Sequence, residues 1–231
     1  MLAASSSPRM FRFATLGLAL FAAPALAQDL GISVRASTLG AGADVAVAVA
    51  PTVNVRGTVN VLAFQHGGVL DEAMTGVSGL TLDYDADLGL GSVGALIDWH
   101  PFGNTFHVTA GALVNLNGGS AEIWTDQPFF SDEFEREFSA ERVGTLRTEV
   151  SYEQPVAPYL GVGVGDLTAG RFGLTAELGM AYVGPPTFEM SGTGLIGGTA
   201  DPANVATLNA GFDSFRLHPV ASIGFKTAFG R

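Results

Sequence analysis

The 231-residue sequence has no cysteine, which excludes disulfide bonds and thiolate metal sites. It is also poor in basic residues, with 11 Lys and Arg against 22 Asp and Glu and a net charge of −11. Proteins that bind nucleic acid rely on Lys and Arg at the phosphates, so this balance argues against a nucleic-acid partner. Long apolar runs are missing as well. Although 47% of the residues are hydrophobic, no run beyond residue 27 approaches the roughly 20 residues of a membrane-spanning helix.

Residues 1–27 have the three parts of a secretory signal peptide. Arg9 and Arg12 form a basic start, an apolar stretch of about eleven residues follows, and Ala25-Leu26-Ala27 offers the small-x-small pattern that a signal peptidase cleaves. We therefore expect cleavage before Gln28 and export of the mature chain, 28–231. Loss of the two arginines leaves 9 basic residues against 22 acidic ones, a mature net charge of −13 (9 − 22).

Apolar side chains in the mature chain recur at every second position, which is the spacing of a strand rather than of a helix. The segments 53–65, 106–117 and 172–182 alternate most cleanly. In the first of them, Val53, Val55, Val59 and Val61 oppose Asn54, Arg56, Thr58 and Asn60. A strand of a membrane barrel has this pattern, because it turns apolar side chains toward lipid and small or polar ones toward the lumen.

Turn signals divide the chain into eight strands. Pro and Gly mark short turns at 50–52, 101–104 and 166–170, whereas 67–79, 125–155 and 185–215 are long and polar or Gly-rich. The predicted strands are 29–38, 41–49, 53–65, 88–100, 105–117, 157–165, 171–183 and 217–229, the first two joined at Leu39-Gly40. An even number of strands closes the sheet and leaves no unpaired edge in lipid. The predicted fold is all-β, a closed antiparallel eight-stranded transmembrane β-barrel with short periplasmic turns and long external loops.

The last predicted strand resembles the C-terminal assembly signal of bacterial outer-membrane proteins. Ser222, Gly224 and Phe229 match its polar residue, glycine and terminal aromatic, whereas Thr227 replaces a usual hydrophobic residue and two residues follow the aromatic. The segments 36–44, 82–88, 98–103 and 218–225 are similar to those of small outer-membrane barrels of proteobacteria, loosely grouped as OmpA-like and OmpW-like. The resemblance implies an outer-membrane location, lipid and lipopolysaccharide as neighbours, insertion by the barrel assembly machinery and a monomer. It implies no established activity.

Five charged residues fall on inner faces by alternation: Asp44, Arg56, Asp98, Glu177 and Lys226. An eight-stranded barrel has room inside for its own side chains and little else. An unpaired charge buried there would be unfavourable by several kcal/mol, so the five must pair or be hydrated. We expect a polar network that seals the lumen; the alternative is a narrow conduction path lined by the same charges.

Asp83, Asp85 and Asp87 alternate and therefore share one face of an extended strand near the predicted external end. With the acidic residues of the long loops they predict an acidic mouth, which would concentrate cations and steer basic solutes. The alternative is a solvated extension of the strand without any ligand.

Two short helices are expected in the long loops. Phe130, Phe134 and Phe138 recur every four residues, which is typical of a short amphipathic helix over 128–142. Residues 201–214 form the second expected helix, although Gly211 is unfavourable within it.

Three classes of function follow, in order of support. The first is a structural or interaction protein of the outer membrane with a largely sealed polar lumen. The second is a small porin-like channel for cationic or small hydrophobic solutes. An enzyme comes third, because the four histidines are scattered and only His66, at the outer rim, is placed for external chemistry, without a Ser or Asp partner at a recognisable spacing. No spacing typical of a metal site or a cofactor motif is present, so we expect no catalytic residues, metal or cofactor.

Overall fold

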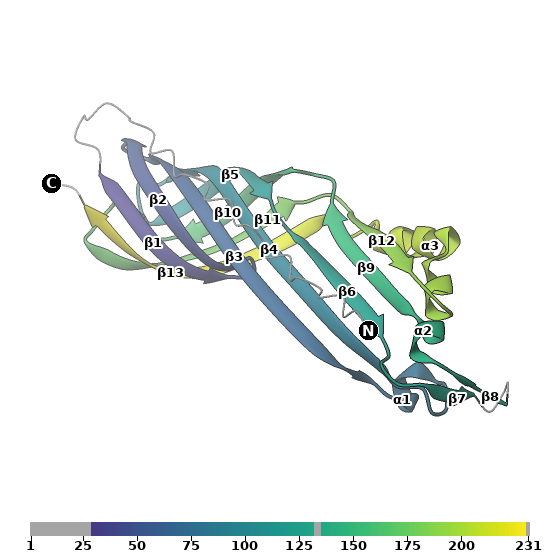
Figure 1. Ribbon diagram of the computed structural model, residues 1–231. Coiled ribbons are helices and arrows are strands. Elements are labelled where there is room, and N and C mark those ends of the chain that lie inside the picture. The colour runs from purple at the N-terminus through teal and green to yellow at the C-terminus, as the bar shows by residue number, and fades with distance from the viewer. Residues whose placement is uncertain (1–28, 132–134, 230–231) are drawn as a thin grey trace, which may run out of the picture.

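The computed structural model describes residues 29–131 and 135–229, and within them eight antiparallel strands form a closed ring (Figure 1). In ring order they are β1 (Leu30–Ser37), β2 (Gly40–Ala50), β3 (Val53–Leu70), β4 (Leu82–Trp99), β5 (Phe106–Asn115), β10 (Val156–Val164), β11 (Phe172–Tyr182) and β13 (Leu217–Phe229). β13 pairs with β1, and β4 pairs with β5, so the ring has no gap. The closed eight-stranded barrel is confirmed. The predicted signal peptide at 1–27 lies outside the described residues.

All eight predicted strands are present, including the first two as separate strands joined by a tight turn at Thr38 and Leu39. Three other short connections, after β2, β4 and β10, lie together at one end of the barrel, which we call the short-turn end. In the described residues no helix is long and apolar enough to cross a membrane.

β3 and β4 are much longer than predicted, with 18 residues each, and they continue past the barrel as a sheet (Figure 1). β6 (Gly118–Trp124), β9 (Thr145–Tyr152) and β12 (Pro186–Gly192) pair in that order beside β4. We call this five-stranded sheet, made with the outer halves of β3 and β4, the extension. The segments expected as polar loops therefore contain strands, because backbone groups of neighbouring hairpins satisfy one another there.

The expected helix over 128–142 is wrong for the described residues. β7 (Phe129–Ser131) and β8 (Arg136–Phe138) form a hairpin, and Phe129 stacks on Phe138 with ring centroids 5.5 Å apart. Cross-strand ring packing therefore decides the local structure, not helical spacing. Phe134 lies outside the described residues.

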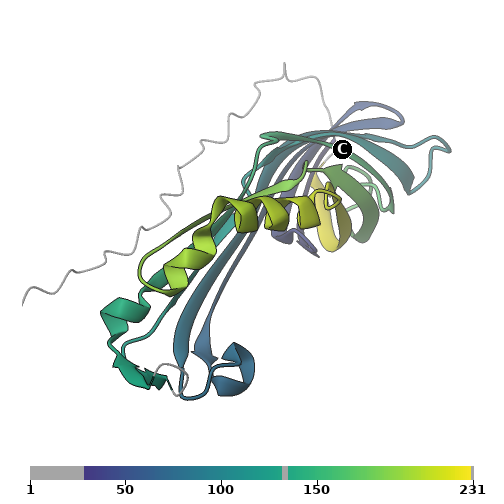
Figure 2. The same cartoon turned by 90° about the vertical axis from the view of Figure 1, so that its right-hand side faces the viewer.

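The remaining elements are helical turns and one true helix. α1 (Glu72–Thr75) caps the tip between β3 and β4, α2 (Ala140–Val143) precedes β9, and η1 (Ile196–Ala200) follows β12. The expected second helix is confirmed as α3 (Pro202–Phe212). The Asp201 side chain accepts from Ala203 N at 2.8 Å and caps its start. Figure 2 shows α3 beside the extension.

The barrel is built inside out relative to a soluble protein. Outward side chains such as Leu174, Leu178 and Ile223 are 70%, 65% and 61% exposed, whereas inward Arg56 and Glu177 are 4% and 5% exposed. The same period-two pattern runs along every strand of the ring, so the outer wall is apolar and the interior is filled with side chains.

Candidate functional site

A buried arginine joins opposite walls of the barrel. Arg56 on β3 places Nη2 2.9 Å from Oδ1 of Asp98 on β4 and 2.6 Å from Oε2 of Glu177 on β11. In the ring order β3 and β11 are four strands apart in either direction, so the contact between Arg56 and Glu177 spans the lumen. The sequence placed all three residues inside, and the structure brings them together.

Three further side chains, on β5 and β10, complete this group of residues, which we call the central network. Thr109 Oγ1 donates to Asp98 Oδ1 at 2.8 Å, and Tyr159 OH donates to Glu177 Oε1 at 2.5 Å. His107 Nε2 lies 3.3 Å from Glu177 Oε2. Glu177 therefore has partners on β3, β5 and β10, which fixes its carboxylate and ties four strands together.

Asp44 belongs to a separate group on the β1–β3 side. Ser33 Oγ donates to Asp44 Oδ2 at 2.6 Å, and Arg35 Nη1 lies 3.6 Å from Asp44 Oδ1. Arg35 Nη2 also donates to Thr58 Oγ1 at 2.5 Å and to Asn60 Oδ1 at 2.7 Å. Arg35 was not among the predicted residues, although alternation from Ile32 and Val34 already placed it on the inner face.

The turn between β10 and β11 closes the lumen at the short-turn end. Its Leu167 is buried, and Lys226, predicted as part of the charged network, instead donates from Nζ to the carbonyls of Ala169 and Gly170. Gly31 on β1 lies so close to this turn that a Cβ there would be 2.0 Å from Leu167 O. The turn therefore packs into the barrel end as a plug, which we call the turn plug (residues 165–171).

Asp166 anchors the turn plug. Its Oδ1 accepts from Asn54 Nδ2, Thr168 N and Thr168 Oγ1, each at 3.0 Å. Burial alone would raise the pKa of Asp166, but the hydrogen bonds from Thr168 and Asn54 and the nearby His100 lower it, and the net shift is downward. The aspartate is thus held ionised. Alternation could not identify it, because it lies in a turn.

An apolar layer fills the other end of the lumen. Leu96, Leu113, Tyr159, Ala181 and Val220 are each at most 5% exposed and pack as one cluster. The lumen thus contains the turn plug, the central network and the apolar layer.

Three of the central side chains could in principle hold a metal ion, since ligand atoms of Asp98, His107 and Glu177 lie within 4.8 Å of one another. The Arg56 guanidinium already contacts both carboxylates and supplies the positive charge. The donor set therefore fits an ion pair rather than a metal.

Asp83, Asp85 and Asp87 lie on the extension rather than around the opening of the lumen. They share a face, as alternation predicts, but the unbroken β3–β4 register puts that face in line with Ile97 and Trp99 on the outer wall. The three aspartates were expected to line an acidic mouth of the lumen. They lie instead outside the lumen, beside the end of the barrel that carries the long loops. Their effect on cations stays a prediction.

The predicted assembly-signal residues lie on β13. Gly224 faces inward, where a Cβ would be 2.8 Å from Thr175 Oγ1, and Ser222 faces inward opposite Glu177. Phe229 faces outward and is 55% exposed. Their role in assembly stays a prediction.

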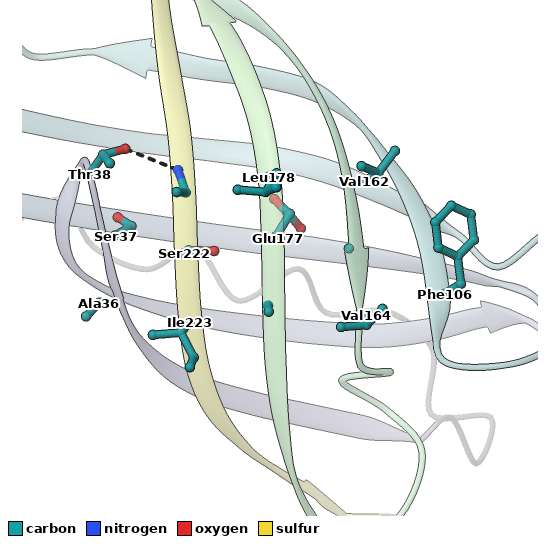
Figure 3. A pocket seen from close by; sticks show the side chains of 13 residues that line it. Ala36, Ser37, Thr38, Phe106, Val162, Val164, Glu177, Leu178, Ser222 and Ile223 are labelled. Atoms are coloured by element: carbon teal, nitrogen blue, oxygen red, sulfur yellow. Dashed lines mark hydrogen bonds between the residues drawn. The ribbon is translucent and has the colours of Figure 1, made fainter.

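A shallow groove of about 810 Å³ crosses the outer wall over β1, β13, β11 and β10 (Figure 3). Small residues, Ala36, Ala176 and Ala221, lie along it, and Val164 and Leu178 flank it. Its lining is almost wholly apolar, which suits contact with acyl chains rather than with a polar substrate.

No family model and no curated protein matches the chain. Solved structures do: CarO2 and CarO of Acinetobacter baumannii align with TM-scores of 0.55 and 0.54 at 19% and 22% identity. These alignments cover 87% and 86% of this chain and 98% and 97% of theirs. Ail of Yersinia pestis, solved with the heparin analogue sucrose octasulfate, aligns over 87% of this chain and 96% of its own at 13% identity, but a TM-score of 0.31 supports no argument. At these identities the likeness concerns the fold: the chain is a closed eight-stranded β-barrel of the kind found in small outer-membrane proteins such as CarO.

Proposed function

We propose that this protein is exported by its first 27 residues and spans the outer membrane as a sealed barrel with a structural or interaction role. The short-turn end faces the periplasm, and the extension projects outside the cell. Lipid and lipopolysaccharide surround the wall, and the extension is the part that meets other molecules.

The apolar outer wall supports the membrane location. Large hydrophobic side chains project from every strand of the ring, including Val34, Val55, Leu160 and Phe225, all at least 43% exposed. Such a surface would aggregate in water but matches the acyl region of a bilayer. Trp99, 52% exposed near the short-turn end, suits the aromatic girdle at the periplasmic interface.

The main support for a sealed lumen is the ion pair between Arg56 and Glu177. It joins opposite walls of the barrel, with Arg56 Nη2 2.6 Å from Glu177 Oε2. An ion crossing at that level would have to break this pair, whose members are both about 5% exposed. The turn plug and the apolar layer close the lumen on either side. A channel for cationic or small hydrophobic solutes is the competing function.

Planar-bilayer conductance of the refolded protein tests the proposal. The sealed barrel gives no discrete steps, whether Asp83, Asp85 and Asp87 are present or replaced by Asn. Discrete cation-selective steps that weaken in the triple Asn variant would establish the channel instead. An Arg56→Ser, Glu177→Ser variant should also stay silent, because the turn plug and the apolar layer still close the lumen on either side of the lost bridge.

A further inference from the structure

The extension has one protected and one open edge. At the β12 edge, Phe188 N donates to Asn209 Oδ1 at 2.8 Å, and Asn209 Nδ2 donates to Phe188 O at 3.1 Å. A side chain of α3 thus takes the place of a neighbouring strand there. At the other edge, β2 pairs with β3 only as far as Val61, and residues 62–70 of β3 have β4 as their one strand partner among the described residues.

Hydrogen-bond alternation identifies the open groups. Gly91 on β4 accepts from Leu116 N and donates to Asn117 Oδ1, so the odd-numbered residues of β4 direct their backbone groups away from β3. The even-numbered residues of β3 therefore bond to β4, and the N–H and C=O groups of Ala63, Gln65, Gly67 and Val69 face outward from the edge. They form a template for one further strand.

The side chains at this edge lack the usual protection. Leu62–Leu70 contains no charged residue and no proline, and charged residues or proline ordinarily block an exposed edge. Leu62 and Phe64, on the face that continues the lumen side, are 40% and 56% exposed. An added strand would cover them with apolar residues at every second position.

The opposite face of the edge favours basic residues. Asp83, Asp85 and Asp87 lie one strand in from the edge, opposite Val69, Gly67 and Gln65. Gly67 has no side chain that would cover Asp85: a Cβ at Gly67 would be 3.3 Å from Tyr84 O and 3.9 Å from Asp85 Oδ1. A Lys or Arg opposite Gly67 on an added strand could therefore extend over the glycine to the carboxylate.

We propose that the open β3 edge, residues 62–70, binds an extended segment of a partner protein in which apolar and basic residues alternate. Backbone hydrogen bonds supply part of the affinity, the apolar residues cover Leu62 and Phe64, and the basic residues meet the three aspartates. A second copy of this chain fits less well, because its own edge is uncharged and the net charge of the mature chain, −13 (9 − 22), repels a like molecule. The proposal gives the interaction role above a specific surface and rests on that role.

The test uses the whole mature chain, residues 28–231, refolded in detergent. The probe is a fluorescent peptide in which valine and lysine alternate. We expect saturable binding by anisotropy and slowed hydrogen exchange at the Gln65 and Gly67 amides. Gln65→Pro removes an outward N–H without touching the β4 ladder and should weaken binding by about tenfold or more. Gln65→Ala keeps the N–H and should bind like the parent protein.

Several results would overturn the proposal. These are no binding of the lysine peptide, equal binding of a peptide with glutamate in place of lysine, or equal binding to the Gln65→Pro protein with its barrel intact by heat-modifiable mobility. If residues 62–70 were protected from hydrogen exchange without peptide, and sedimentation showed the protein to be a dimer, the edge would be assigned to a second copy of the chain. Conductance of the lumen is measured in a separate experiment. A barrel that conducts ions but still binds the peptide would refute the sealed lumen and leave the binding edge supported.

Discussion

At the scale of single residues, Arg56 bridges two buried carboxylates. Its guanidinium carries one positive charge and contacts both Asp98 and Glu177, each 5% exposed or less. A buried ion pair is a weak source of net stability, yet removal of one partner leaves the other charge uncompensated. The network is therefore expected to specify one arrangement of the strands around the lumen.

Arg56→Met should lower the free energy of unfolding by about 3–5 kcal/mol, because it leaves two carboxylates in the lumen without a counter-charge. Urea unfolding in vesicles, followed by tryptophan fluorescence, measures this. Addition of Glu177→Gln should recover part of the loss. Arg147→Met is the matched control: its pairs with Glu122 and Glu149 are about half exposed, so the change should stay within about 1 kcal/mol. Equal effects of the two substitutions would contradict the central network.

Asp166 predicts a pH dependence. Its pKa is lower in the folded protein than its ordinary value of 3.8. Its contribution to stability is therefore complete well above pH 3.8 and is lost as the pH falls below 3.8 and through the lower pKa of the folded state. The difference in urea midpoint between the parent protein and Asp166→Asn should be largest at neutral pH and shrink below about pH 4. Other carboxylates titrate in both proteins and cancel in the difference. A pH-independent difference would show that the carboxylate is not held ionised by the turn plug.

At the scale of elements, the turn plug depends on one close backbone approach. Gly31→Ala places a methyl group against Leu167 O and should displace residues 165–171, lowering the unfolding midpoint and speeding proteolysis in the turn. Gly57→Ala is the control, because the nearest atom to a Cβ there is Val45 O at 3.9 Å. If both substitutions behave alike, the turn does not pack into the barrel end as described.

The strands of the ring could be predicted from the sequence because an apolar outer wall around a filled interior imposes a period of two on every strand. Residues such as Arg56 and Glu177 were identified by the same alternation. Partners could not be assigned, because the pairing of β3 with β11 residues depends on ring closure rather than on neighbours in the chain. Asp166 and the hairpin at Phe129–Phe138 were missed since neither follows a strand or helix period over enough residues.

At the scale of the whole molecule, β3 and β4 contribute to two different surfaces, the apolar outer wall of the ring and the acidic face of the extension. Within the ring, β3 and β4 turn Val55 and Ile97 outward, and beyond it the same face carries Asp83, Asp85 and Asp87. The change from apolar to acidic residues on one continuous face is expected where a strand leaves the bilayer for water. The extension is thus part of the barrel strands and not a separate domain.

Spin-label accessibility along β11 tests the account most directly, and the absence of cysteine allows single labels to be introduced cleanly. In vesicles, labels at Leu174, Ala176, Leu178 and Met180 should collide with oxygen, which concentrates in lipid, and not with a water-soluble nickel complex. A label at Thr175, an inward position that is not glycine, should be poorly accessible to both, because the lumen is filled. Nickel accessibility at the even-numbered positions would contradict a lipid-facing wall, and nickel accessibility at Thr175 would contradict the sealed interior.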